Sequence, residues 1–413
     1  MRPSFWSGTL EGDWNSRIID LVVVGGGFAG LSTAYHCLEA RADLDVVILD
    51  RDEVGSGASG RNAGMVIPFP LFTPWLMDGS PSRADAIWGY AAWRDMLTGL
   101  IAADNGQLLQ ARDADVVVTS TNWVWSTGLK WVGRRGRQLG FEVETFGSDE
   151  VSRRYGGAGQ FGISFPGWSV QPWQTGQSLK RAVLAQGAQI AEGVEVVGIA
   201  EGNGYVELAT ASGPVRARRV VVCTNAYSSS IAGVGPQGKT VHTYVLATEP
   251  LPDGIAERLG GERALVSELG AGMIYRRVHD NRLIFGGLDV GGLTPTESAA
   301  QNAQSRAKLR ELMRACLPWL PELAIEREWG GAFVDREDPP NLSASAEISG
   351  LYFNTGYGGS GVAMTLPSGR LARGLLYPEL DDPDAARLRQ MMQQTRITLP
   401  GLMRAGMEIV FGR

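Results

Sequence analysis

Three glycines and one aspartate near the start of the chain have the types and spacing of a nucleotide-binding site. Gly25, Gly27 and Gly30 fill the glycine positions of a G-x-G-x-x-G sequence, and Asp50 follows about 20 residues later. In such a sequence the first glycine makes a tight turn, the second lets the backbone approach a pyrophosphate, and the third lets a helix pack against a strand. A carboxylate at Asp50 accepts hydrogen bonds from a ribose, so these residues predict a dinucleotide site.

Apolar runs around these residues supply the elements that would position them. Residues 21–24 are a β-branched run of the kind found in buried strands, and residues 46–49 form a second run that ends at Asp50. The residues at helical spacing between the two runs are Leu31, Ala34, Tyr35 and Leu38. This order predicts a βαβ unit whose helix begins at a bound phosphate. The alternative is a glycine-rich turn in a βαβ unit that binds no nucleotide.

A second glycine-rich turn, residues 356–361, lies near the other end of the chain. It follows an apolar run at 351–355 and precedes a predicted helix over about 362–376. Backbone N–H groups and the positive end of that helix would again face a ligand. The two turns together predict one long cofactor that is held from both ends.

The stretches between the two turns predict both helices and strands. Residues 51–64 form a loop rich in glycine and serine, expected either to lie over the cofactor or to be a flexible surface loop. Residues 84–140 have a helical pattern, and their tryptophans Trp88, Trp93, Trp123, Trp125 and Trp131 are expected to pack in a core or a lid. Further helices are predicted over about 175–186 and 305–317, and strands at 187–190, 194–199, 205–209, 215–217, 219–226, 240–250 and in a hairpin over 272–289.

Composition limits the class of protein. The chain has 413 residues, 44% of them apolar and 20% charged, and a net charge of −6 without a basic block, which argues against nucleic acid as a partner. The three cysteines are far apart, so a reducing, cytoplasmic location is expected, without a disulfide framework. The three histidines have no metal-ligand spacing. No signal peptide and no membrane span are expected, and residues 1–17 are predicted to be a polar arm.

Six segments, in order and spread over nearly the whole chain, carry a resemblance to a known family. They are VVVGGGFAGLSTAYH (22–36), GASGRNAG (57–64), VVVCTNAY (220–227), YRRVHDNRLIFGG (275–287), WGGAFVDREDPP (329–340) and GYGGSGVAMT (356–365). With these segments the chain resembles the flavin-dependent D-amino-acid oxidase superfamily, which includes glycine oxidase and sarcosine oxidase. Within it, the chain is most similar to the gamma-glutamylputrescine oxidase-like branch.

The resemblance implies FAD, with the ADP half held by Gly25, Gly27, Gly30, Asp50 and Arg51. It implies non-covalent binding, because relatives with covalent flavin use a cysteine in the segment equivalent to 330–335 or a histidine in the early loop, and this chain has neither. The other cofactor-binding candidates are Ser59, Arg61, Asn62, Ala63 and Gly64 in the early loop, Val196 at the adenine, Thr224 and Asn225 near it, and Gly358, Gly359, Ser360, Gly361 and Val362 at the pyrimidine edge of the flavin.

The reaction implied by the resemblance is removal of hydride from the carbon beside a neutral amine to flavin N5, giving an imine that hydrolyses. The amine is held in a dry pocket and needs no side-chain base. Candidate residues of this substrate pocket are Tyr244, Tyr275, Arg277, Trp329 and Tyr357. Arg277 would clamp a substrate carboxylate, or else be an ion-pairing arginine on a hairpin.

The electron acceptor is expected to be O2, which is reduced to H2O2. The sarcosine-oxidase branch has one lysine in the hairpin and another after the last glycine turn. This chain has no lysine at residues 282–285 of the hairpin, and it has Ala363 after the turn. An FAD amine dehydrogenase with another acceptor, a non-catalytic flavoprotein subunit and an NAD(P)-dependent dehydrogenase are the alternatives. The identity of the amine, the oligomeric state and the pathway stay open.

The predicted fold class is α/β. A Rossmann-like FAD-binding domain is expected from residues 18–83, 150–230 and 335–380, which are discontinuous in the chain. An α+β substrate domain on a mixed or antiparallel sheet is expected from residues 84–149 and 231–334, followed by a tail at 381–413.

Overall fold

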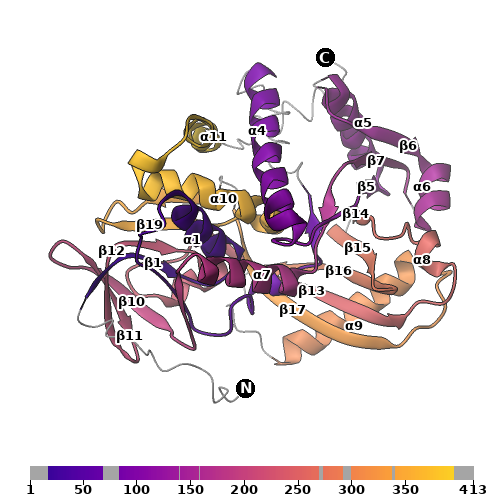
Figure 1. The fold of residues 1–413 in the computed structure, drawn as a ribbon. Helices are drawn as coiled ribbons and strands as arrows, with labels where there is room; N and C mark the ends of the chain where they lie inside the picture. The colour runs from indigo at the N-terminus through magenta and orange to yellow at the C-terminus, as the bar shows by residue number, and fades with distance from the viewer. Residues whose placement is uncertain are drawn as a thin grey trace.

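Two large sheets form the framework of the protein (Figure 1). The computed structural model describes residues 17–67, 83–138, 140–157, 159–268, 273–291, 299–336 and 340–394. The predicted N-terminal arm, except for Arg17, and residues 395–413 of the tail lie outside these ranges.

The first sheet has parallel strands at its centre. Its path runs β10-β11-β12-β1-β2-β9, with β19 beside β12 and β18 beside β19. Strands β1, β2, β9, the end of β12 and β19 are parallel to their neighbours in this group. The bounds are β1 Ile18–Val24, β2 Val46–Asp50, β9 Gln189–Glu192, β10 Val196–Glu201, β11 Val206–Thr210, β12 Gly213–Val222, β18 Asn341–Ala344 and β19 Leu351–Thr355. The apolar runs at 21–24 and 46–49 are buried on both faces, as central parallel strands require.

The second sheet is antiparallel except for one pair. Its order is β17-β13-β16-β15-β14-β5-β7-β6, and only β14 and β5 run parallel. The bounds are β5 Val116–Ser120, β6 Glu144–Gly147, β7 Phe161–Phe165, β13 Lys239–Pro250, β14 Ala264–Glu268, β15 Met273–His279, β16 Arg282–Gly291 and β17 Ile325–Asp335. The hairpin predicted over 272–289 is confirmed, with its turn at Asp280 and Asn281 in left-handed conformation. A small third sheet joins β3 (Met65–Val66), β8 (Trp168–Ser169) and β4 (Arg112–Asp113).

Helices cover both sheets (Figure 1). Helices α1 (Phe28–Ala40) and α10 (Gly361–Leu376) pack on the first sheet, α7 (Pro172–Ala185) packs on α1, and α4 (Arg83–Ala102) and α11 (Pro383–Gln394) pack on α10. Those of the second sheet are α5 (Trp123–Gln138), α6 (Ser148–Tyr155), α8 (Ile255–Arg258) and α9 (Ala299–Cys316). The remaining short helices are α2 (Ala58–Arg61), η2 (Ala103–Gly106), η3 (Asn225–Ser230), η4 (Gly358–Ser360) and η5 (Pro378–Leu380). None of the helices in the described ranges has both the length and the hydropathy to cross a bilayer.

The helices that follow the two glycine turns, α1 and α10, are in close contact. The Ser32 hydroxyl of α1 donates to the carbonyl of Leu366 in α10, 334 residues away in sequence. At Gly369 of α10, a Cβ would overlap the backbone carbonyl of Ser32. A glycine at this position therefore lets the two backbones approach, and the contact fixes where the two helix N-termini lie relative to each other.

Several expectations about local structure were wrong. The hairpin predicted from residues 205–209 and 215–217 is confirmed as β11 and β12, but β12 continues without a break to Val222, so 219–226 does not begin a separate strand. Strand β5 interrupts the stretch predicted to be helical, because Val116–Ser120 is an apolar run that pairs with β7 and β14. The tail, for which no motif was found, contains α11. The apolar side of this helix packs on α4 and α10. The early loop contains the short helix α2.

The division of the chain into two domains stays a prediction. Strand β7 falls within 150–230, which was assigned to the FAD-binding domain, but it pairs with β5 and β6 of the second sheet. We propose that the boundary lies after Phe165, and that the cofactor-binding part resumes with α7.

We expect Gly369→Ala to destabilise the protein by about 2–3 kcal/mol, because the new Cβ must push α10 away from Ser32. Gly99→Ala in α4 is the matched control: a Cβ there meets no atom within 4 Å, so the midpoint of unfolding should stay or rise slightly. Thermal unfolding of the two variants checks this, and equal midpoints would contradict the close contact.

Candidate active site

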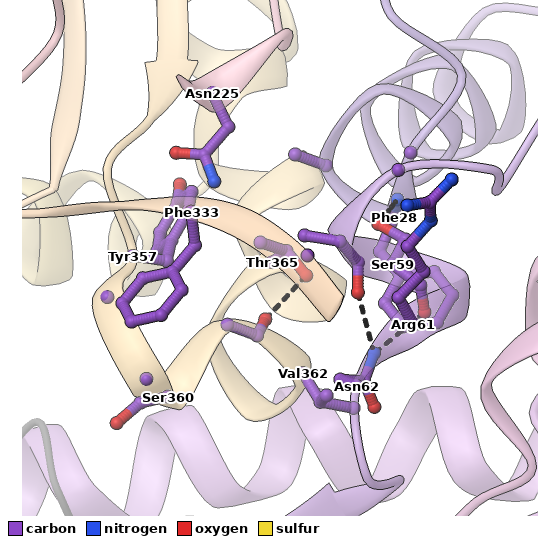
Figure 2. Close-up of a pocket in the computed structure, with 18 of the residues that line it drawn as sticks. Phe28, Ser59, Arg61, Asn62, Asn225, Phe333, Tyr357, Ser360, Val362 and Thr365 are labelled. Atoms are coloured by element: carbon purple, nitrogen blue, oxygen red, sulfur yellow. Dashed lines mark hydrogen bonds between the residues drawn. The ribbon is translucent and has the colours of Figure 1, made fainter. Parts of the chain in front are cut away.

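One cavity of about 830 Å³ receives both glycine turns. Gly25 and Gly27 line it from the start of α1, and Gly358, Gly359, Ser360 and Gly361 line it from the start of α10. In Figure 2, Ser360, Tyr357 and Phe333 lie on one side of this space and Ser59, Arg61 and Asn62 on the other, with Val362 and Thr365 between them. The volume is in the range of small-molecule and cofactor pockets.

The first turn requires its glycines for two different reasons. Gly25 has φ +103°, a conformation that favours glycine, and a Cβ there would meet the backbone of Cys223 at 3.2 Å. At Gly30, a Cβ would overlap the carbonyl of Gly25, so this glycine allows α1 to pack against the turn. Gly30 does not line the cavity, and its role is packing. The N–H of Phe28, at the first turn of α1, donates to the Ser59 hydroxyl at 2.9 Å.

Asp50 lies at the carboxyl end of β2 and lines the same cavity. Its carboxylate accepts the N–H of Gly26 at 2.6 Å and the N–H of Asp52 at 2.9 Å. Burial raises the pKa of Asp50 to about 6, although both N–H donors act in the opposite direction. The guanidinium of Arg51 lies over the ring of Tyr227, 4.4 Å from its centre.

The early loop is held in place by its own side chains. The Asn62 amide donates to the carbonyls of Ala58 and Ser59, and its oxygen accepts the N–H of Gly64 at 2.8 Å. Arg61 donates to the carbonyl of Ser56 at 2.7 Å and to that of Gly330 in β17 at 3.2 Å. The loop is thus folded and tied to the second sheet, which favours the prediction of a cofactor cover over that of a flexible surface loop.

The second turn leaves room that no protein atom fills. A Cβ at Gly359 or Gly361 would meet nothing within 4 Å, although both glycines line the cavity. No neighbouring group of the described protein therefore requires glycine at these two positions. A ligand that packed against this backbone would require glycine there, and the first N–H groups of α10 together with its dipole favour negative charge at that place.

The cofactor candidates largely gather around the cavity. Gly30 and Gly64 are the two that do not line it; those that do are Gly25, Gly27, Asp50, Arg51, Ser59, Arg61, Asn62, Ala63, Val196, Thr224, Asn225, Gly358, Gly359, Ser360, Gly361 and Val362. Their individual roles toward the cofactor stay proposals.

Two of the five substrate-pocket candidates line the cavity. The Tyr275 hydroxyl lies 3.1 Å from that of Thr243, and both residues are in the lining. The Tyr357 hydroxyl donates to the side-chain oxygen of Asn354, and burial raises the pKa of the phenol. Asn354 in turn donates to Thr33 at 3.1 Å, so Tyr357 is anchored to α1.

The other three candidates are placed elsewhere. Tyr244 is fully buried in the core beneath the second sheet, and Trp329 donates its indole N–H to the carbonyl of Arg61 at 2.7 Å. Arg277 donates to the carbonyl of Gly64 at 2.8 Å and contacts His279 Nδ1 at 2.8 Å. Burial lowers the pKa of Arg277 to about 10, so it remains charged at neutral pH while it braces the loop. The structure does not place it to clamp a substrate carboxylate.

Sequence reasoning missed several residues of the lining. They are Phe28, Tyr227, Thr243, Gly331, Ala332, Phe333 and Thr365. The sequence could have indicated Thr365, because it stands one helical turn after Gly361. In the structure its hydroxyl donates to the carbonyl of Gly361 at 2.6 Å. Phe333 lies in a β17 segment that contributed to the resemblance, but its side of the strand could not be known before the pairing of β17 with β13.

The lining fits a dinucleotide with a flavin at one end. The Asp50 carboxylate suits a ribose, and the N-terminus of α1 suits a pyrophosphate. The open space at Gly359 and Gly361, at the N-terminus of α10, suits a negatively charged ring edge. Cys223 also lines the cavity, but burial raises the pKa of its thiol, which stays neutral and lacks thiolate reactivity. We propose that binding is non-covalent.

The comparisons with known proteins point the same way. The family model for FAD dependent oxidoreductases matches residues 20–375. Gamma-glutamylputrescine oxidoreductase of Escherichia coli (strain K12) is 27% identical over 89% of this chain and 85% of its own, and a probable oxidoreductase, OrdL, of Haemophilus influenzae is 25% identical over 85% and 81%. The crystal structure of glycine oxidase from Geobacillus kaustophilus has the same fold, with a TM-score of 0.73 and 20% identity over 89% of this chain and 96% of that one.

We expect Gly359→Ala to weaken FAD binding by at least about tenfold while the ligand-free protein unfolds at the same temperature, because the new methyl group meets only the ligand. Titration with FAD and thermal unfolding measure the two effects. Gly147→Ala is the control, since a Cβ there also meets nothing within 4 Å but lies outside the lining. An unchanged FAD affinity for Gly359→Ala would contradict the assignment of this turn.

We expect FAD affinity to depend on the ionisation of Asp50. Ribose hydroxyls donate to a carboxylate, and the pKa of Asp50 is about 6 without ligand, so binding should tighten as the pH rises through 6. Between pH 7 and pH 5 the affinity should fall about tenfold. Fluorescence titrations of FAD across this range test it, with Asp50→Asn expected to give weaker binding and a flat profile. A flat profile for the unmodified protein would refute the role.

Proposed function

The chain belongs to the family of FAD dependent oxidoreductases, and on that premise we propose that it oxidises a primary or secondary amine or an amino acid at the carbon beside nitrogen. FAD is its cofactor. The observation that carries the proposal is the single cavity that two glycine turns and Tyr275 line together, since it offers space for a substrate next to a cofactor. The printed name of the Escherichia coli relative, an oxidoreductase of gamma-glutamylputrescine, adds support for an amine.

The protein's part in this reaction is to hold FAD and the amine, to orient them toward each other and to keep water out of the cavity. When bound, FAD supplies a two-electron acceptor for hydride. The N-termini of α1 and α10, whose glycine turns line the cavity, would stabilise negative charge on a bound cofactor. The hydroxyl pair of Tyr275 and Thr243 offers hydrogen bonds to an amine nitrogen from the second sheet.

The state of the amine matters for this chemistry. Only the neutral amine has a lone pair to assist departure of hydride from the neighbouring carbon. A pocket without water raises the cost of the ammonium form and so favours the neutral amine. No side-chain base is assigned, because the role of the residues is to keep the neutral amine in position.

We propose O2 as the electron acceptor, with H2O2 as product. One observation favours a dehydrogenase as the second candidate. The chain has four lysines, Lys130, Lys180, Lys239 and Lys308, and none of them lines the cavity. Its lining cations are Arg51 and Arg61. A cytoplasmic location also stays a prediction.

We expect the isolated protein to be yellow and to lose its flavin absorbance when an amine or amino acid is added without oxygen. A panel of primary amines, secondary amines and amino acids, followed at the flavin spectrum, provides the test. Readmission of air distinguishes an oxidase, which recovers its colour and produces H2O2, from a dehydrogenase, which needs an added dye. An FAD-loaded protein that no member of the panel reduces would contradict the proposed reaction and favour a non-catalytic subunit.

A further inference from the structure

We propose that the substrate is an apolar amine without a carboxylate, and that it occupies the part of the cavity between α5 and the second sheet. The inference rests on the proposed function and adds the substrate class to it. It separates this protein from enzymes that bind amino acids, since those must neutralise a carboxylate.

This part of the cavity, which we call the apolar half, is lined by hydrocarbon and aromatic side chains. Trp125, Leu129 and Val132 come from α5, and Val118, Phe165 and Val266 come from neighbouring strands of the second sheet. The polar side chains that the second sheet adds are the hydroxyls of Thr243 and Tyr275, which lie 3.1 Å apart. This lining favours a hydrocarbon or aryl group with one small polar end.

The charged side chains of the cavity lie elsewhere. Among the described residues, the lining acids and bases are Asp50, Arg51, Asp52, Arg61 and Glu195. All of them come from loops and strand ends of the first sheet or from the early loop, and none comes from α5 or the second sheet.

Two arginines beside the early loop bind backbone carbonyls. Arg61 donates from Nε to the carbonyl of Ser56 at 2.7 Å and from one Nη to that of Gly330 at 3.2 Å, which orients its guanidinium along the early loop. Arg277 is outside the lining and holds the carbonyl of Gly64 and the ring of His279. Because α5 and the second sheet add no cation to the described lining, a substrate carboxylate in the apolar half would lose its hydration without a charged partner from these elements, which is a heavy penalty.

The same lack of charge suits an amine. No carboxylate of the described residues in the apolar half stabilises an ammonium group, so desolvation lowers the pKa of a bound amine toward its neutral form. The apolar half thus selects the protonation state that the oxidation needs, while it rejects amino acids.

Trp125 is the residue that we assign to substrate specificity. It lines the cavity and yet is 58% exposed, which places it at the mouth. Trp123, on the same helix, is 66% exposed and does not line the cavity. The two tryptophans therefore allow the effect of a tryptophan at the mouth of the cavity, Trp125, to be compared with that of a tryptophan outside it, Trp123.

The first experiment compares substrates that differ by one carboxylate. 2-Phenylethylamine and phenylalanine (both enantiomers) are added to the FAD-loaded protein without oxygen, and the flavin absorbance is followed. The amine should reach half-saturation at a concentration lower by a factor on the order of 100. Equal or better reduction by phenylalanine would overturn the inference and leave the proposed oxidation standing. Reduction by neither compound, nor by any member of the wider panel, would refute the proposed function and the inference with it.

The second experiment measures binding without chemistry. 2-Phenylpropan-2-amine and 2-amino-2-phenylpropanoate have no hydrogen on the carbon beside nitrogen, so calorimetry reports their affinity alone. The amine should bind at least about tenfold more tightly than the amino acid. Trp125→Ala should weaken amine binding about tenfold, and Trp123→Ala should change it less than about twofold. Similar affinities for the two ligands, or equal effects of the two variants, would overturn the assignment.

Discussion

The contact between α1 and α10 is the constraint on which the rest of the structure depends. Each helix begins at a glycine turn, and the missing side chain of Gly369 lets the two backbones meet at Ser32. Since helices are stiff, this single crossing sets the separation of their N-termini and hence the length of ligand that fits between them. Asn354 extends the contact by hydrogen bonds to Thr33 of α1 and Ser368 of α10, each 3.1 Å long.

The cavity that results has two different chemical environments. Around the two helix N-termini it is bounded by backbone N–H groups and charged side chains such as Asp50 and Arg51, which suit an anionic cofactor. Beneath α5 it is bounded by residues such as Trp125 and Phe165, which suit hydrocarbon. Under the proposed function, the first sheet would hold FAD and the second sheet would select the substrate.

Local patterns sufficed to predict the parts of the site that depend on backbone. The turn at Gly25, the acid at Asp50 and the turn at Gly359 each follow from spacing within one strand–turn–helix unit. Their meeting in one cavity was predicted as well, from the idea that a long cofactor needs two grips. The strands of the first sheet were also recognisable, because central parallel strands are apolar on both faces.

Side-chain roles on the second sheet were harder to predict, because they depend on register. Tyr244 on β13 and Tyr275 on β15 lie on the two strands that flank β16, but Tyr244 is in the core and Tyr275 lines the cavity. Arg277 looked suited to a carboxylate, and only the position of the Gly64 carbonyl shows where its guanidinium is bound. Helix α11 was missed since one of its two partners, α4, is distant in sequence.

The sequence distance between Ser32 and Leu366 has a consequence for biosynthesis. As the ribosome synthesises this chain from its N-terminus, α1 and its turn emerge long before α10. Until α10 emerges, the cavity lacks the second of the two glycine turns that line it. We therefore expect FAD to bind only after α10 has been synthesised, so that a chain truncated before α10 keeps only part of the binding site.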